Sequence, residues 1–180
     1  MRVILSILLV SQLFVASGQS ISIVPSDSMK HMHAWKTTKK GMFVLSSWAA
    51  LNIGSGFYLA SKTTGSTSSF HQMNGLWNTV NLGLGVIGYF TARKKMNVFN
   101  ADRFPSDIKK QIKILRINSY LDLGYMAAGG ALWALSDRTK SPKISQGYGI
   151  SIITQGAFLF LFDRILAKKI ENKAIHFNVY

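Results

Sequence analysis

Four long apolar stretches divide this sequence, and each is about as long as a helix that crosses a bilayer. Residues 41–60 and 73–92 contain no charged side chain, and residues 117–135 and 147–167 contain very few. A helix rises 1.5 Å per residue, so roughly 20 residues cross the hydrocarbon of a bilayer. We therefore predict an all-α fold, a four-helix transmembrane bundle that forms one membrane domain over residues 41–167.

The charges lie between these stretches rather than within them. The chain carries 21 Lys and Arg residues against 7 Asp and Glu, a net charge of +14. A nucleic-acid-binding protein would gather such residues on a folded surface that neutralises phosphates. Here they flank apolar stretches, so we expect a multi-pass membrane protein. Its partner is then the lipid bilayer, not nucleic acid, with a homo-oligomer or another membrane protein as a further option.

The first 18 residues have the parts of a secretory signal peptide. Arg2 precedes a run of about 14 apolar residues, and small residues follow as far as Gly18. We predict cleavage after Gly18, the alternative being an uncleaved anchor. Residues 19–40 are expected to form a polar, irregular N-terminal segment, and residues 168–180 a basic tail with little structure.

The long basic connection between the second and third spans contains a second helix signal. Pro105 and Ser106 are typical of a helix start, with Ser106 as N-cap and Asp107 in the first turn. Ile108, Ile112 and Leu115 then recur on one face. We expect an amphipathic helix that begins here and continues into the third span.

Two signals for orientation disagree. Sixteen basic residues lie in residues 19–40, between the second and third spans, and from Arg164 to the C-terminus, whereas four lie in the other two loops. By the positive-inside rule, both ends of the mature chain are cytoplasmic. A cleaved signal peptide would instead deliver the N-terminus to the outside.

One strongly polar side chain lies near the middle of each span. These residues are Asn52, Asn81, Asp122 and Gln155. In an antiparallel bundle they lie near the same depth, so we predict a polar layer inside the bundle. One turn away on the same faces lie Trp48, Trp77 and Asn118, which we include in this layer.

Two interpretations of this layer stay open. Amides that hydrogen-bond between helices fix register, at roughly 0.6–2 kcal/mol each, and would make this a structural or interaction component of the membrane. Asp122 favours the alternative, because ionisable residues inside spans usually face a cavity, a partner or a transport path. The alternative is a small transporter or channel-like protein that uses Asp122 and the Asn/Gln layer as an ion or proton path.

Glycines inside the spans are expected to let helix backbones approach closely. They are Gly54, Gly83, Gly85, Gly88 and Gly124. Three of them, from Gly83 to Gly88, match the spacing of a dinucleotide-binding loop. That loop lies between a strand and a helix, so we reject the match inside an apolar span.

The strings GMFVLSSWAALNIGSG and FHQMNGLWNTVNLGLG share the pattern Trp-x-x-x-Asn-x-Gly. Over residues 36–167 the chain resembles a functionally uncharacterised family of small four-helix membrane proteins from Bacteroidota. The resemblance implies a fold and a membrane location, but no activity and no site residues.

No motif for catalysis or for a cofactor accompanies this pattern. The sequence has no phosphate-binding loop, no HExxH, no CxxC and no GxSxG. His31 and His33 beside two methionines could hold a soft metal, but two histidines in a polar segment are more often interfacial side chains. We therefore predict no metal site and no cofactor, and favour a non-enzymatic role.

Overall fold

The structure, a computed structural model, describes residues 26–175 and consists of four long helices. They are α2 (Asp27–Lys62), α3 (Gly65–Met96), α4 (Phe104–Ala134) and α5 (Pro142–Ile175), with a short 3-10 helix η2 (Ser136–Arg138) before α5. The predicted signal peptide, residues 1–18, lies outside the described residues. The prediction of an all-α four-helix bundle is confirmed.

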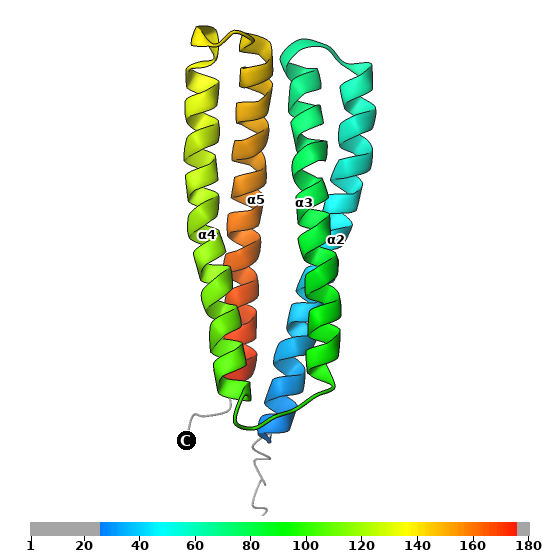
Figure 1. The fold of residues 1–180 in the computed structure, drawn as a ribbon, viewed down its shortest axis with the longest axis vertical. Coiled ribbons are helices and arrows are strands. Elements are labelled where there is room, and N and C mark those ends of the chain that lie inside the picture. The colour runs from blue at the N-terminus through cyan, green and yellow to red at the C-terminus, as the bar shows by residue number, and fades with distance from the viewer. Residues whose placement is uncertain (1–25, 176–180) are drawn as a thin grey trace, which may run out of the picture.

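The helices form two antiparallel hairpins that lie side by side (Figure 1). Only Thr63 and Thr64 separate α2 from α3, while η2 lies between α4 and α5. α5 contacts each of the other three helices. The start of α2, the end of α5 and the connection 97–103 all lie at one end of the bundle, which we call the basic end (Figure 1).

The helices are longer than the predicted spans, and three expectations are corrected. The segment 19–40 is helical from Asp27 onward, with the Ser26 hydroxyl accepting from the Met29 N–H at 3.4 Å. Residues 61–72, which separate the first two predicted spans, belong mostly to α2 and α3. The tail expected after residue 167 is helical to Ile175. Polar and basic side chains by themselves do not end a helix. The 36 residues of α2 extend over about 54 Å.

The start of α4 also differs from the prediction. Arg103, not Ser106, is the N-cap residue, and Pro105 lies in the first turn, where its missing N–H is not needed. The Ser106 hydroxyl donates to the Arg103 carbonyl at 2.9 Å instead of capping the helix. Asp107 lies in the first turn, as expected.

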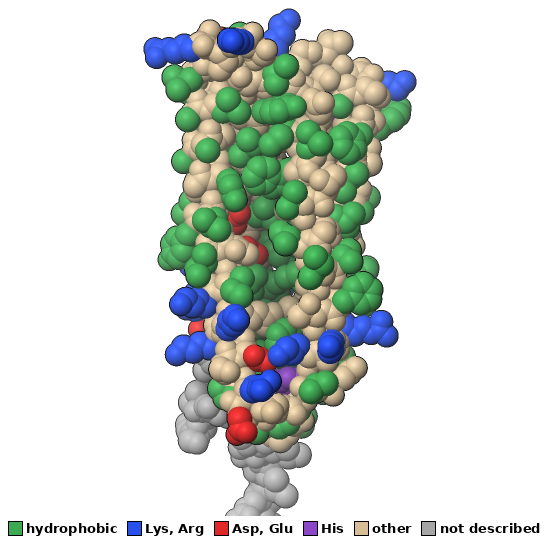
Figure 2. Space-filling view, viewed as in Figure 1, with side chains coloured by type: hydrophobic (Ala, Val, Ile, Leu, Met, Phe, Trp, Pro, Cys, Tyr) green, Lys and Arg blue, Asp and Glu red, His purple; other side chains and the backbone are tan. Residues whose placement is uncertain are grey.

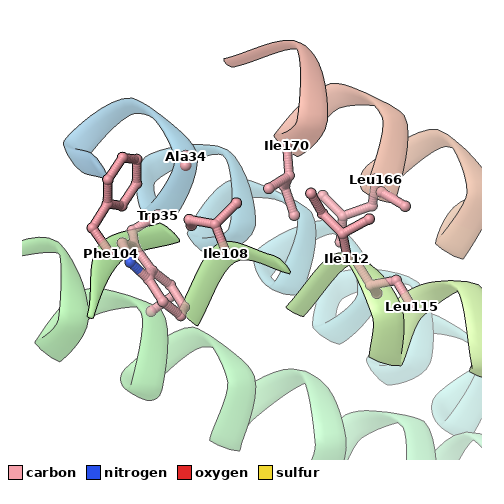
Figure 3. Close-up of a cluster of buried hydrophobic side chains, with 10 residues drawn as sticks. Ala34, Trp35, Phe104, Ile108, Ile112, Leu115, Leu166 and Ile170 are labelled. Carbon is pink, nitrogen blue, oxygen red and sulfur yellow. The ribbon is translucent and has the colours of Figure 1, made fainter. Parts of the chain in front are cut away.

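The basic end has an ordinary hydrophobic core. Apolar side chains of all four helices are buried together there, as Figure 3 shows for eight of them. The cluster consists of Ala34, Trp35, Ala92, Phe104, Ile108, Ile112, Leu115, Leu166, Ala167 and Ile170. Lys and Arg side chains surround this end of the visible face (Figure 2).

Further along the bundle, the distribution of polar and apolar side chains is reversed. We call this part the middle section, and define it by its buried polar residues Asn74, Asn78, Asn81, Ser119, Asp122, Ser151, Gln155 and Asp163. Large apolar side chains face outward here: Leu51 is 72% exposed and Ile87 is 67% exposed. The visible face of the middle section is covered by hydrophobic side chains and carries no Lys or Arg (Figure 2).

By length and apolar composition, α2 and α5 could cross a membrane. In the most apolar stretch of α2, 17% of the residues are buried inside the bundle, and in that of α5, 33%. Most residues of these stretches are therefore partly or fully exposed rather than buried in the bundle.

Candidate functional site

A chain of hydrogen-bonded amides joins three helices in the middle section. Asn74 of α3 donates to the Asn52 Oδ1 of α2 at 2.9 Å, and its own Oδ1 accepts from the Gln155 side chain of α5. Along α3, Asn81 donates to the Asn78 Oδ1 at 3.3 Å, and Asn78 donates to the Asn74 carbonyl at 2.8 Å. We call these five residues the amide cluster.

The sequence of α3 explains why the cluster forms. Asn74, Asn78 and Asn81 follow at intervals of four and three residues, so they share one helix face. Close helix contact lets these short side chains reach their partners: a Cβ added to Gly56 of α2 would come within 2.9 Å of the Gly75 backbone nitrogen. The amide cluster therefore fixes the register of α2, α3 and α5.

Two buried carboxyls lie apart from the amide cluster. Asp122 of α4 is 4% exposed and Asp163 of α5 is 7% exposed. In the described part of the chain, neither makes a hydrogen bond to an amide of the cluster. The two lie close enough for their charges to interact.

Both carboxyls line a cavity of about 610 Å³ between α3 and α4. We call it the carboxyl groove. Its walls include Trp77, Asn81 and Leu84 from α3, and its other side is formed largely by α4. Acidic side-chain atoms are visible inside the hollow of the molecular surface, between hydrophobic side chains (Figure 2).

Three buried polar atoms on residues that line the groove have no hydrogen-bond partner within residues 26–175. They are Asp122 Oδ2, Gln111 Oε1 and Trp35 Nε1. The Gln111 amide nitrogen is used, since it donates to the Thr38 hydroxyl at 2.6 Å. Unsatisfied buried polar atoms are uncommon in proteins, and those on residues that line a cavity are candidates for contact with a bound ligand.

The aromatic rings of Trp77 and Tyr125 meet edge to face across the groove, with centroids 5.1 Å apart. They come from α3 and α4, the two helices that the groove separates. At the basic end, the groove reaches Lys95 and Asp107, which form an ion pair at 2.7 Å. The groove thus has an aromatic contact toward one end and a paired cation at the other.

A second cavity, of about 540 Å³, adjoins the groove at the basic end and shares Thr91, Lys95 and Asp107 with it. His31 lines this cavity and is only 3% exposed. Its ring packs edge-on against Phe99 and Phe104. Burial lowers the pKa of His31 from its ordinary value; Asp107 opposes this shift and Lys95 adds to it.

The predicted polar layer is therefore divided between two places. Asn52, Asn81 and Gln155 belong to the amide cluster, whereas Asp122 lines the groove. Asn118 also lines the groove, although it is exposed. Trp77 contacts Tyr125, as described above.

In the described residues, the Trp48 indole makes no hydrogen bond to the amide cluster. Its Nε1 has no hydrogen-bond partner, and its ring stacks on Phe158 at a centroid distance of 4.1 Å. Its backbone carbonyl accepts from the Asn52 amide at 2.8 Å. Trp48 therefore joins α2 to α5 by ring packing.

Three residues of these sites were missed by the sequence reasoning. Asn74 and Asn78 could have been found, because with Asn81 they repeat at helical spacing within one span. Asp163 lies near the end of the predicted span 147–167, away from the predicted polar layer. Its place beside the groove depends on how α4 and α5 pack, which no local pattern reveals.

The predicted packing glycines also fall into two groups. A Cβ at Gly85 would come within 2.5 Å of the Ser46 hydroxyl, and one at Gly88 within 2.6 Å of the Met42 sulfur, so these two do pack against α2. A Cβ at Gly54, Gly83 or Gly124 would meet no atom within 4 Å. Within this chain, these three lie on open faces, which corrects the expectation for them.

The match to a family model covers residues 44–164, most of the four-helix region. The chain belongs to DUF6992, a family of unknown function. The residues that match DUF6992 include the whole amide cluster and both groove carboxyls. The match by itself indicates neither a membrane location nor a source organism. No curated protein and no solved structure matches the chain.

The described residues contain no group of three or more His, Asp and Glu side chains that could hold a metal ion. The groove lining combines three carboxyls, two lysines, amides and aromatic rings with largely apolar walls.

Proposed function

We propose that this chain is a multi-pass integral membrane protein whose middle section lies in the bilayer. One observation carries the proposal: the same four helices bury apolar residues at the basic end and polar residues in the middle section. A surface that exposes Phe43, Leu51, Ile87 and Phe90 together would be unstable in water. In lipid, such a surface is favourable, and amides satisfy each other inside the bundle.

The charges support the basic end as the cytoplasmic side. Lys and Arg of the α3–α4 connection, of the start of α2 and of the end of α5 belong to this end, while Lys62, Arg138, Lys140 and Lys143 belong to the other. This distribution follows the positive-inside rule, with the bacterial inner membrane as the proposed location.

The absence of native cysteine makes the topology directly testable. A single cysteine is introduced at Asp102 in the α3–α4 connection, or at Lys140 before α5, both of which are exposed. In intact bacterial cells, a membrane-impermeant maleimide should label Lys140→Cys, and Asp102→Cys only after permeabilisation. The reverse pattern would support a cleaved signal peptide instead, and release of the protein by alkaline carbonate would rule out membrane insertion.

Within this membrane protein, the amide cluster supports a structural or interaction role. Its residues are joined to one another across three helices. A partner subunit would then contact the outer apolar faces, where Gly54, Gly83 and Gly124 leave room for close approach. Light scattering of the protein in detergent tests this role, and a strictly monomeric protein with no copurifying subunit contradicts it.

The carboxyl groove favours a second candidate function, the binding or transport of a small ligand or ion. Asp122 lines an open cavity of about 610 Å³, with one carboxyl oxygen unpartnered. A carboxyl that served only to join helices would be expected to have its partner within the bundle. The unpartnered Asp122 oxygen beside this cavity is the observation that supports a transport path or a ligand-binding site here.

A further inference from the structure

We propose that the carboxyl groove binds a lipophilic amine, with the ammonium group against Asp122 and Asp163 and the apolar body along the groove. The proposal rests on the membrane location proposed above, because the ligand would enter sideways from the bilayer. It gives the second candidate function a substrate class.

The first argument is charge. Every ion pair in the described residues involves other acids: Asp27 with Lys30, Asp107 with Lys95 and Glu171 with Arg116. Asp122 and Asp163 have no basic partner among the described residues, although both are more than nine-tenths buried. A buried, unpaired carboxylate is costly, and a bound cation offsets that cost.

The second argument is hydrogen bonding. An ammonium group has up to three N–H donors and no acceptor. The groove offers it the Asp163 carboxyl and the Asp122 Oδ2, which has no hydrogen-bond partner among the described residues. Protonation of both carboxyls would remove their charge, but it would leave the cavity unfilled and these acceptors unused.

The third argument is the character of the walls. Most of the lining is apolar or aromatic, including Met42, Leu84, Leu121 and Leu159. Trp77 and Tyr125 present rings of the kind that attract organic cations. The volume falls within the roughly 300–1,000 Å³ of small-molecule sites.

The same walls argue against an inorganic cation. Ca²⁺ requires about six to eight oxygen ligands, and Mg²⁺ is usually bound with several waters. The described residues contain no group of three acidic or His side chains that could supply a metal site. An organic cation with an apolar body uses both the carboxyls and the hydrophobic walls.

Binding is measured with the full chain in lipid nanodiscs. The probes are octylamine and, as a neutral control of the same length, 1-octanol. Trp35 and Trp77 line the groove, so intrinsic fluorescence reports its occupancy. Octylamine should give a saturable change that 1-octanol and empty nanodiscs do not give; an equal response to 1-octanol overturns the proposal.

Substitutions test whether the two carboxyls bind the ammonium group of octylamine. Replacing both, Asp122→Asn with Asp163→Asn, should weaken octylamine binding at least roughly tenfold, because charge-assisted hydrogen bonds are lost. Asp137→Asn removes one acid from exposed η2 and should leave binding unchanged. Unchanged binding in the double variant overturns the proposal.

Folding is checked separately by circular dichroism and gel filtration of each variant. If the double variant does not fold, the two single variants are compared, and each should bind octylamine more weakly than the wild type. If octylamine does not bind and Leu84→Cys cross-links two copies, the groove holds a helix of a second copy and the proposal is wrong. Carbonate extraction tests the membrane location independently, so failure of that proposal can be distinguished from failure of this one.

Discussion

The basic end and the middle section bury opposite kinds of side chains. At the basic end, Trp35, Ile108 and Ile170 are buried in an apolar cluster. In the middle section, Asn78 and Gln155 are buried and Leu51 and Ile87 face outward. Since the same four helices form both regions, the difference supports the proposed change from water to lipid along the bundle axis. Burial of apolar groups stabilises only where the alternative is water, whereas polar contacts and close packing matter more in lipid.

The largest expected effect comes from cutting an aliphatic side chain at the basic end. Ile170 is fully buried, so Ile170→Ala should lower the free energy of unfolding by about 2–5 kcal/mol through lost burial and a residual cavity. Leu51→Ala, in the middle section, changes a side chain that is 72% exposed and should cost less than about 0.5 kcal/mol. Unfolding in mild detergent, followed by circular dichroism, measures both. Equal losses of unfolding free energy in the two variants would contradict the distinction between the two regions.

A smaller effect is expected from glycines of the middle section, and two neighbours on α2 form a matched pair. In Gly56→Ala, the new Cβ would lie within 2.9 Å of backbone atoms of α3, and overpacking of this kind costs about 1–3 kcal/mol. Gly54→Ala places its Cβ in open space and should be neutral or stabilising, since Ala favours helix. The midpoints of thermal unfolding of the two variants test this. A destabilising Gly54→Ala would indicate contact with a partner subunit.

Removing one amide tests the polar interior. Asn74→Ala breaks the hydrogen bonds to Asn52 and Gln155 and should cost about 0.6–2 kcal/mol. Asn118→Ala removes an exposed amide and should have little effect on stability. Both are compared by unfolding in the same detergent. If the two behave alike, the amide cluster does not hold the helices in register.

The smallest effect is a pH dependence at the basic end. Because the pKa of His31 is lowered in the folded state, the unfolded state binds more protons as pH falls below the ordinary value of 6.5. The contribution of His31 is therefore fully present above pH 6.5 and is lost as pH falls toward the folded-state pKa. Thermal melts between about pH 7.5 and about pH 5.5 should show this loss. His31→Phe keeps an aromatic ring and should reduce the slope; an unchanged slope would assign it to other groups.

Much of the fold could be predicted from local patterns. Uncharged stretches such as 73–92 gave the number of helices and their antiparallel order. Helix ends were predicted less well, because Ser106 and the polar segment after residue 19 carry local signals that tertiary packing overrode. Asp27 begins a helix at the basic end because Ala34 and Trp35 have a hydrophobic core to enter there.

The sequence by itself determined that polar residues would lie inside an apolar bundle, because apolar helices have few other places for Asn52, Asn81, Asp122 and Gln155. Only the tertiary structure decided which of these residues join the amide cluster and which line the carboxyl groove. α5 lies against α2, α3 and α4, which brings Gln155 to Asn74, while α3 and α4 stay apart and leave Asp122 and Asp163 in a groove. The physical reason is that helical periodicity fixes which face a residue occupies, whereas the neighbour of that face depends on how whole helices pack.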